Sequence, residues 1–317
     1  MRILYVLTDL ILPLLVGYYL QKGNWMRDEL CNKLISFNIV VICTILSILS
    51  FWVLPLNFEL VWLPFFGIIL CVIPGVIGYF FGGRQYENPL ERGSYLSSAI
   101  LSNIGTLGGL CAFILYGEIG FAYAQMVGIF QNLVLVLFCF PLAQYFYQGH
   151  ESSAKKKKIK FSLRQMFLSW NQLPVAGMIV GMFLSIYEVP RPIALSMFFD
   201  SLIHIGAWLA LLPVGFLIDF KQAKKYYLSI WKLLPIKFIA TPFITYFMIR
   251  FLFTDQVLIG TIMVLAVTPT AINAVVTAKL FKLNVDLSIA AFILTTAIYL
   301  LFVFPGLFLY IKTGNLF

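Results

Sequence analysis

Two short segments place polar residues and glycines in the middle of long apolar stretches, where they could bind a small anion. The first segment, Ser102 to Leu110, reads SNIGTLGGL and supplies Asn103, Gly105, Thr106, Gly108 and Gly109. The second segment, Val267 to Ala274, reads VTPTAINA and supplies Thr268, Pro269, Thr270 and Asn273. A helix interrupted there presents backbone N–H groups and a partial positive charge at the start of the next half-helix. The predicted chemistry is therefore binding of a carboxylate without a lysine or arginine on either stretch.

Backbone chemistry explains why these segments should interrupt a helix. Pro269 lacks an N–H group and clashes with the preceding turn, and Thr268 is expected to cap the half-helix that follows. The glycines permit conformations that other residues resist. Non-helical backbone persists in hydrocarbon only where protein buries it or where it lines a cavity, so two interruptions at one depth predict a shared site. The alternative is that the glycines serve tight helix packing and that Pro269 makes an ordinary kink.

The composition places these segments inside a membrane. Of the 317 residues, 61% are apolar and 11% are charged, whereas soluble domains carry about 25% charged residues. The net charge of +9 comes from short basic stretches between apolar spans, which predicts contact with membrane lipid and no nucleic-acid partner. The five cysteines are scattered without a CxxC pair, which predicts packing residues and no metal site. The apolar N-terminus lacks a small-x-small cleavage site, so we expect a retained first helix.

Ten apolar spans separated by polar turns follow from the sequence. Their predicted ranges are 3–20, 34–54, 60–81, 94–116, 121–146, 167–187, 197–219, 228–252, 256–279 and 286–310. A basic cytoplasmic loop at 148–166 divides them into a first five-helix repeat at 1–147 and a second at 167–317. Because five is odd, the two halves must have opposite orientations, so the predicted fold is an all-α membrane protein with two inverted repeats. The sequences LPLLVG at 12–17 and LPVAG at 173–177 are a weak similarity between the two halves. Each polar segment falls in the fourth span of its half.

The distribution of basic residues predicts the orientation. The loops after the odd-numbered spans, together with Lys232 and Lys237 at the start of span eight, hold 18 of the 22 lysines and arginines. Only Arg2, Arg191, Arg250 and Lys312 lie on the other side. Basic residues favour the cytoplasmic side, so both termini are expected to be non-cytoplasmic, in a bacterial inner (plasma) membrane.

A few polar residues inside other spans are candidates for coupling transport to an ion or for completing the polar site. Asp200 and His204 are four residues apart on one helical face and could form a proton relay, or serve as a helix cap and a satisfied histidine. Asp9 could face the same cavity or the outer interface. Gln131 and Asn132 in span five could complete the polar site or bond between helices.

The two polar segments resemble the auxin efflux carrier family of the bile-acid, arsenite and riboflavin transporter superfamily. The N-x-G-x-x-G core is present as Asn103, Gly105 and Gly108, and the later segment matches at Pro269, Ala271 and Ala274. Where the family often has proline after its glycine pair, this chain has Leu110. The resemblance implies ten helices in two inverted repeats, with the fourth helix of each repeat broken and the two breaks crossing near the substrate.

These observations predict a secondary transporter of small organic anions, such as mono- or dicarboxylates or auxin-like acids, working by alternating access. No cofactor is expected, and the coupling ion would be H⁺ or Na⁺. The alternatives are a ten-helix drug or metabolite exporter with intact fourth helices, a non-transporting membrane sensor, and an intramembrane enzyme. The enzyme is disfavoured because the chain has only His150 and His204, without a clustered carboxylate. The oligomeric state is open, with a homodimer as one option.

Overall fold

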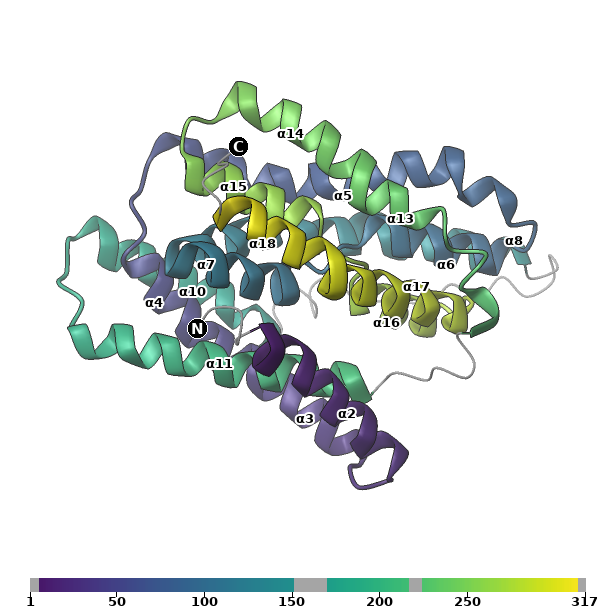
Figure 1. The fold of residues 1–317 in the computed structure, drawn as a ribbon, viewed down its shortest axis with the longest axis horizontal. Helices are drawn as coiled ribbons and strands as arrows, with labels where there is room; N and C mark the ends of the chain where they lie inside the picture. The colour runs from purple at the N-terminus through teal and green to yellow at the C-terminus, as the bar shows by residue number, and fades with distance from the viewer. Residues whose placement is uncertain (1–5, 151–169, 217–223, 313–317) are drawn as a thin grey trace. The chain divides into compact units, whose positions relative to one another are not determined.

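The computed structural model describes residues 6–150, 170–216 and 224–312, and within these ranges the chain is helical without strands (Figure 1). Six helical runs in this part of the chain are long and apolar enough to cross a membrane, namely Glu29–Trp52, Phe58–Gln85, Ile104–Gly149, Ile193–Phe216, Leu233–Leu252 and Val285–Ile311. Leu173–Ile186 and Gln256–Ala266 are shorter apolar helices. The protein is therefore an all-α integral membrane protein. The ten spans and the inverted repeats stay predictions, and most of the basic loop at 148–166 lies outside the described residues.

The helices form two compact units, and each unit draws on both halves of the chain. The described residues of the first unit come from 6–60, 109–125 and 170–216, and those of the second unit from 61–108, 126–150 and 224–312. These units are defined by contacts and do not coincide with the predicted repeats, which concern internal symmetry.

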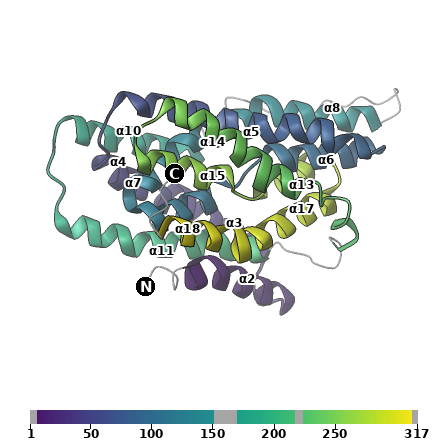
Figure 2. The same ribbon diagram turned by 45° about the horizontal axis from the view of Figure 1, so that its top comes forward.

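The first unit contains two closely packed helix pairs (Figure 2). Its helical segments are η1 (Val6–Ile11), α2 (Leu12–Lys22), α3 (Asp28–Phe37), η2 (Asn38–Cys43), α4 (Thr44–Trp52), the start of α7 (Gly109–Val134), η7 (Trp170–Gln172), α10 (Leu173–Ile186) and α11 (Ile193–Phe216). Helix α2 packs on α11, and α10 packs on α4. A Cβ atom at Gly17 would overlap the backbone of Leu212, and one at Gly177 would lie 2.7 Å from the carbonyl oxygen of Thr44. Small residues at these positions let the backbones approach closely.

The second unit surrounds both predicted interruptions. Its helical segments are α5 (Leu63–Phe81), η4 (Gly83–Gln85), α6 (Pro89–Ile100), η5 (Ile104–Gly108), the end of α7, η6 (Leu135–Cys139), α8 (Phe140–His150), η8 (Lys224–Tyr226), α13 (Leu233–Pro235), η9 (Ile236–Ala240), α14 (Thr241–Leu252), α15 (Gln256–Ala266), α16 (Ile272–Leu280), α17 (Val285–Ile298), η10 (Tyr299–Val303) and α18 (Phe304–Lys312), while η3 (Phe58–Trp62) lies at its boundary. Helix α6 packs against α5, α8, α16 and α17, so the segment after α6 begins inside the unit.

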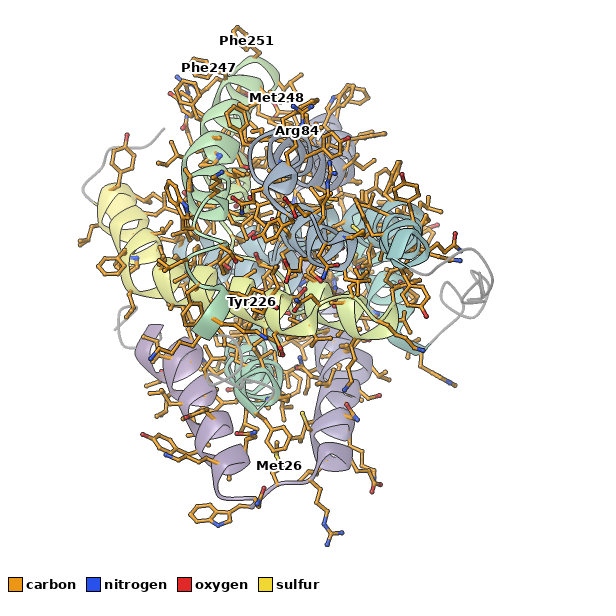
Figure 3. All side chains as sticks on the ribbon, turned by 90° about the vertical axis from the view of Figure 1, so that its right-hand side faces the viewer. Met26, Arg84, Tyr226, Phe247, Met248 and Phe251 are labelled. Atoms are coloured by element: carbon orange, nitrogen blue, oxygen red, sulfur yellow. The ribbon has the colours of Figure 1, made fainter. Side chains whose placement is uncertain are left out.

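One face of α14 presents aromatic side chains outward. Phe243, Phe247 and Phe251 are spaced by one helical turn and are 63%, 50% and 87% exposed, and Figure 3 shows the last two pointing away from the ribbon. In a soluble protein such a stripe would mark a binding surface. On a helix this apolar, contact with lipid explains it, in agreement with the membrane assignment.

Candidate functional site

Both polar segments interrupt their helices, as the sequence predicts. Helix α6 ends at Ile100, Leu101 is extended with φ −86° and ψ 112°, and helical backbone resumes at Ile104. Helix α15 ends at Ala266, and α16 begins after Ala271, which is extended with φ −76° and ψ 151°. We call residues 101–103 the first break and residues 267–271 the second break. The predicted interruptions are therefore confirmed, but the first lies at the start of its polar segment and includes Leu101 before it. The expectation that the glycines there adopt non-helical backbone is wrong, because Gly105, Gly108 and Gly109 lie in helical segments.

The two breaks lie side by side and satisfy each other's backbone. Ser102 and Thr270 form an isolated antiparallel β-bridge. The N–H of Asn103 donates to the carbonyl oxygen of Pro269 at 2.8 Å, and the N–H of Ala271 donates to that of Leu101 at 2.9 Å. Unpaired backbone groups are costly in hydrocarbon, and each break supplies the partners that the other lost with its helix. The pairing therefore brings the predicted site residues of both segments together within the second unit.

Several predicted site residues use their polar atoms to hold the breaks. The side-chain oxygen of Asn103 accepts from the N–H of Leu107 at 3.4 Å, which caps the helical turn after the first break. The hydroxyl of Thr270 donates to the carbonyl oxygen of Ser98 at 3.0 Å. The prediction that Thr268 caps the following half-helix is wrong, because its hydroxyl donates backward to the carbonyl oxygen of Leu265 at 2.7 Å.

Three other predicted site residues have surface that a ligand could reach. Gly105 and Asn273 are exposed and Thr106 is half-buried, whereas Gly108 and Gly109 are buried. Helix α16 starts without a side-chain cap on Ala271. The hydroxyl of Thr106 and the amide of Asn273 are therefore the predicted polar groups best placed to contact a ligand.

The structure adds a residue that the sequence reasoning assigned to the membrane surface. Lys237, in η9, is fully buried, and its Nζ donates to Ser102 Oγ at 2.7 Å and to the carbonyl oxygen of Leu101 at 3.3 Å. The two polar stretches themselves carry no lysine or arginine, but this amine reaches the first break from a different span. A signal was present, since Lys237 lies inside the apolar run LLPIKFIA, where an ionisable residue is a functional candidate by default.

The charge of Lys237 has no acidic partner in the described ranges, where the ion pairs involve Lys33, Arg191, His204 and Lys225. Gln131 completes the shell around the first break, because its side-chain nitrogen donates to the carbonyl oxygen of Ser102 at 2.5 Å. Asn132 is exposed and does not take part. Cys71 and Cys139 are buried with Leu101 and Ala271 in one apolar cluster, and all five cysteines are unbridged. The surroundings of Lys237 are thus neutral.

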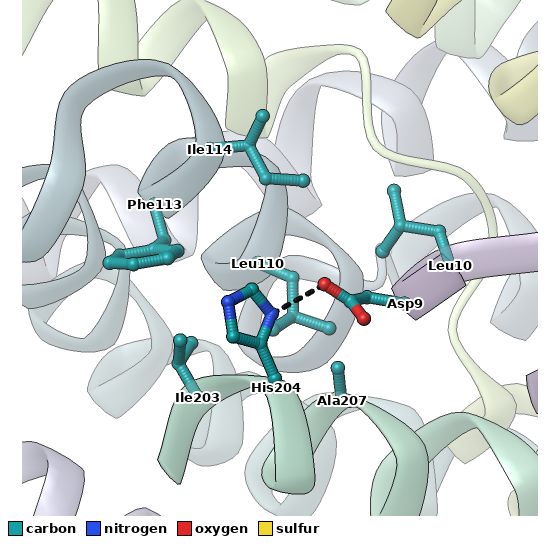
Figure 4. A pocket seen from close by; sticks show the side chains of 8 residues that line it. All are labelled: Asp9, Leu10, Leu110, Phe113, Ile114, Ile203, His204 and Ala207. Atoms are coloured by element: carbon teal, nitrogen blue, oxygen red, sulfur yellow. Dashed lines mark hydrogen bonds and ion pairs between the residues drawn. The ribbon is translucent and has the colours of Figure 1, made fainter. Parts of the chain in front are cut away.

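Of the two interpretations of Asp200 and His204, a direct pair does not form, whereas His204 does have a hydrogen-bond partner. Asp200 is exposed on α11, and His204 pairs instead with Asp9 in η1, with 2.6 Å between His204 Nδ1 and Asp9 Oδ2 (Figure 4). Both partners belong to the first unit. Spacing of four on one helix suggested the wrong carboxylate, because the correct one is 195 residues away in the sequence.

No family model matches this chain, and no curated protein matches it with significance. The functional argument therefore depends on the residues and their geometry.

Proposed function

We propose that this protein is a secondary transporter of small organic anions, working by alternating access around the two paired breaks. The observation that carries the proposal is the amine of Lys237, buried at the first break without an acidic partner among the described residues. The amine contacts the first break, which is itself paired with the second, and interrupted helices that meet are typical of substrate sites in transporters built from repeats.

The electrostatics favour an anion at this place. A charged ammonium group removed from water loses several kcal/mol of solvation unless an opposite charge or hydrogen bonds compensate it. A lysine has three N–H donors, and two of those on Lys237 are used by Leu101 and Ser102. When the amine is protonated, its third donor and its charge can be satisfied by a carboxylate oxygen. The partial positive charge at the start of α16 adds to the attraction.

The resemblance to the auxin efflux carrier family supports the same function. In that family the broken fourth helices cross near the substrate, and the matching residues here, Asn103 and Pro269, form a hydrogen bond between the two breaks. The resemblance implies substrates such as mono- or dicarboxylates, two inverted repeats, and coupling to H⁺ or Na⁺. A bacterial inner membrane and non-cytoplasmic termini are part of the proposal.

The test is flux through purified protein in proteoliposomes. A thermal-shift screen with small carboxylates selects a ligand, and uptake of the labelled ligand is then measured for wild type, Lys237→Met and Lys237→Arg. Loss of one charge-assisted hydrogen bond, worth about 1.5–3 kcal/mol, should weaken apparent affinity by about 10- to 150-fold in Lys237→Met. Lys237→Arg should retain part of the activity because the positive charge remains.

The matched control is Lys232→Met, which removes a half-buried lysine from the residue just before α13. It should leave uptake unchanged. Normal uptake by folded Lys237→Met would refute the role of the amine, and absence of flux for every carboxylate in wild type would favour a non-transporting sensor. The exporter alternative requires an intact fourth helix, and the first break counts against it.

A further inference from the structure

The first unit contains a second polar site, which the proposed substrate site does not use. His204 Nδ1 lies 2.6 Å from Asp9 Oδ2, and the hydroxyl of Thr8 donates to Asp9 Oδ1 at 3.2 Å. The side chains of His204 and Asp9 are 31% and 11% exposed. The pair joins η1 to the middle of α11, one of the helices apolar enough to cross a membrane. Ionisable residues at such positions are costly and mark functional sites by default.

Apolar residues surround the pair. A cavity of about 10 Å³ adjoins it and is otherwise lined by Leu10, Leu110, Phe113, Ile114, Ile203 and Ala207 (Figure 4). This volume is close to the minimum that holds one water molecule. Among the described residues that line this cavity, Asp9 and His204 are the only ionisable groups.

Charged groups on the neighbouring elements are placed elsewhere. Asp200, one turn earlier on α11, is exposed. Glu118 of α7 pairs with Arg191, and Glu29 of α3 pairs with Lys33. Lys22 ends α2, and none of these side chains lines the cavity. Cys31 of α3 contacts the carbonyl oxygen of Pro213, and the thiol of Cys43 in η2 is also outside the lining.

The pair has two states that differ by one proton. When His204 is neutral, its Nδ1–H donates to the Asp9 carboxylate and the pair carries a net charge of −1. When the imidazole gains a proton, the pair becomes neutral while the same hydrogen bond is kept. An uncompensated charge is much more expensive in an apolar environment than a neutral pair. Histidine is also the side chain that exchanges protons near neutral pH.

We propose that Asp9 and His204 form a proton-binding site whose occupancy controls the transport cycle. The role in the cycle rests on the proposed transport function, whereas proton binding by the pair does not. When the pair gains a proton, its net charge changes from −1 to zero inside the apolar interior of the first unit. When it loses the proton, the negative charge returns. The proposal therefore names H⁺ as the coupling ion.

The first experiment measures proton binding without a substrate. The chain contains only two histidines, His150 and His204, so ring-labelled histidine gives two NMR signals, which His150→Gln assigns. In full-length protein in nanodiscs, the His204 signal should change with pH, and Asp9→Asn should alter this response because the imidazolium loses the partner of its Nδ1. Asp200→Asn is the control and should leave the His204 titration unchanged. A signal that stays fixed between about pH 5 and 8 would overturn the proposal.

The second experiment measures coupling in proteoliposomes with the carboxylate chosen above. An inward proton gradient should drive accumulation of the labelled carboxylate by wild type and Asp200→Asn at least about 10-fold better than by His204→Gln or Asp9→Asn. Exchange of the labelled carboxylate without a gradient should persist in wild type and in all three variants. Equal gradient-driven accumulation by wild type and either folded variant would overturn proton control and leave the transporter assignment intact. If wild type exchanges no carboxylate, the transporter assignment and the role in its cycle both fail, and NMR alone decides whether the pair binds a proton.

Discussion

Substitution of Gly108 by alanine tests the close packing of the two breaks. Gly108 has helical backbone angles, φ −62° and ψ −46°, so alanine is compatible with the local conformation. Its Cβ would lie 2.8 Å from Leu265 Cδ2, 3.0 Å from Thr268 Cγ2 and 3.3 Å from the carbonyl oxygen of Asn103. Carbon atoms in ordinary contact are about 3.5–4.0 Å apart, so the closest neighbour would have to move by roughly 0.7 Å or more.

The neighbours of Gly108 have little freedom to move. Leu265 and Thr268 are fully buried, and the threonine hydroxyl is held by the carbonyl oxygen of Leu265 at 2.7 Å. Overpacking of this kind costs about 1–3 kcal/mol. Gly105→Ala is the matched control, because a Cβ there meets nothing within 4 Å. Each change replaces a glycine by alanine and so lowers the conformational entropy of the unfolded chain, which stabilises the folded protein by about 0.4–1 kcal/mol. This contribution is the same in both variants and cancels in the comparison.

Thermal unfolding of the two purified variants in the same detergent gives the answer. Gly108→Ala should unfold at a lower temperature than Gly105→Ala by an amount corresponding to about 1–3 kcal/mol. Equal unfolding temperatures would refute the close packing of η5 against Leu265 and Thr268. Uptake adds a second comparison, because Gly105 is exposed. If Gly105 borders the substrate, Gly105→Ala should raise the apparent KM without loss of stability.

Two further predictions concern the first unit. Arg191→Met should destabilise the protein by about 3–5 kcal/mol, because it removes the guanidinium that lies 2.5 Å from the largely buried Glu118 carboxylate. Thermal unfolding should show that the double variant Arg191→Met with Glu118→Gln recovers much of that stability. A double variant as unstable as Arg191→Met would contradict the pairing. Gly117→Ala should cost about 1–3 kcal/mol through backbone strain alone, because φ is +69° and ψ is −153° while a Cβ meets nothing within 4 Å. Gly128→Ala, in the helical part of α7 and equally unobstructed, is its control, and equal unfolding temperatures would exclude strain at Gly117.

The sequence predicts the breaks well because their causes are local. Pro269 lacks a donor at the second break, and Ser102 and Asn103 begin the polar segment at the first, so the approximate positions of both breaks follow from the sequence. Gly105, Thr106, Gly108 and Gly109 do not belong to the first break, because they lie in the helical backbone after it. The structure then shows how the lost backbone hydrogen bonds are replaced, through the bridge of Ser102 with Thr270. Local chemistry thus predicts where a helix stops and leaves open which distant segment completes its hydrogen bonds.

The residues that the sequence reasoning missed depend on contacts between distant segments. Lys237 is 135 residues from Ser102 in the sequence, and Asp9 is 195 residues from His204. The orientation rule counts charge near span ends without regard to depth, so it groups Lys237 with the surface lysines. A spacing of four brings Asp200 to the same helical face as His204, whereas a pairing across helices leaves no periodic signal in the sequence. Only the tertiary packing distinguishes these cases.

The glycine contacts of the first unit support the proposed inverted repeat from an independent direction. Exchange of the two chain halves would relate α2 to α10 and α4 to α11, so the contact of α2 with α11 would become the contact of α10 with α4. Both contacts are present, and each depends on glycines on one or both helices that meet a backbone carbonyl group, with Gly17 and Gly215 in one contact and Gly177 and Gly181 in the other. The LPLLVG and LPVAG sequences supply Gly17 and Gly177, which gives their weak similarity a physical reason. In the second unit the fourth span of each half contributes one of the two paired breaks. The same exchange of the chain halves would relate the two breaks to each other within that unit.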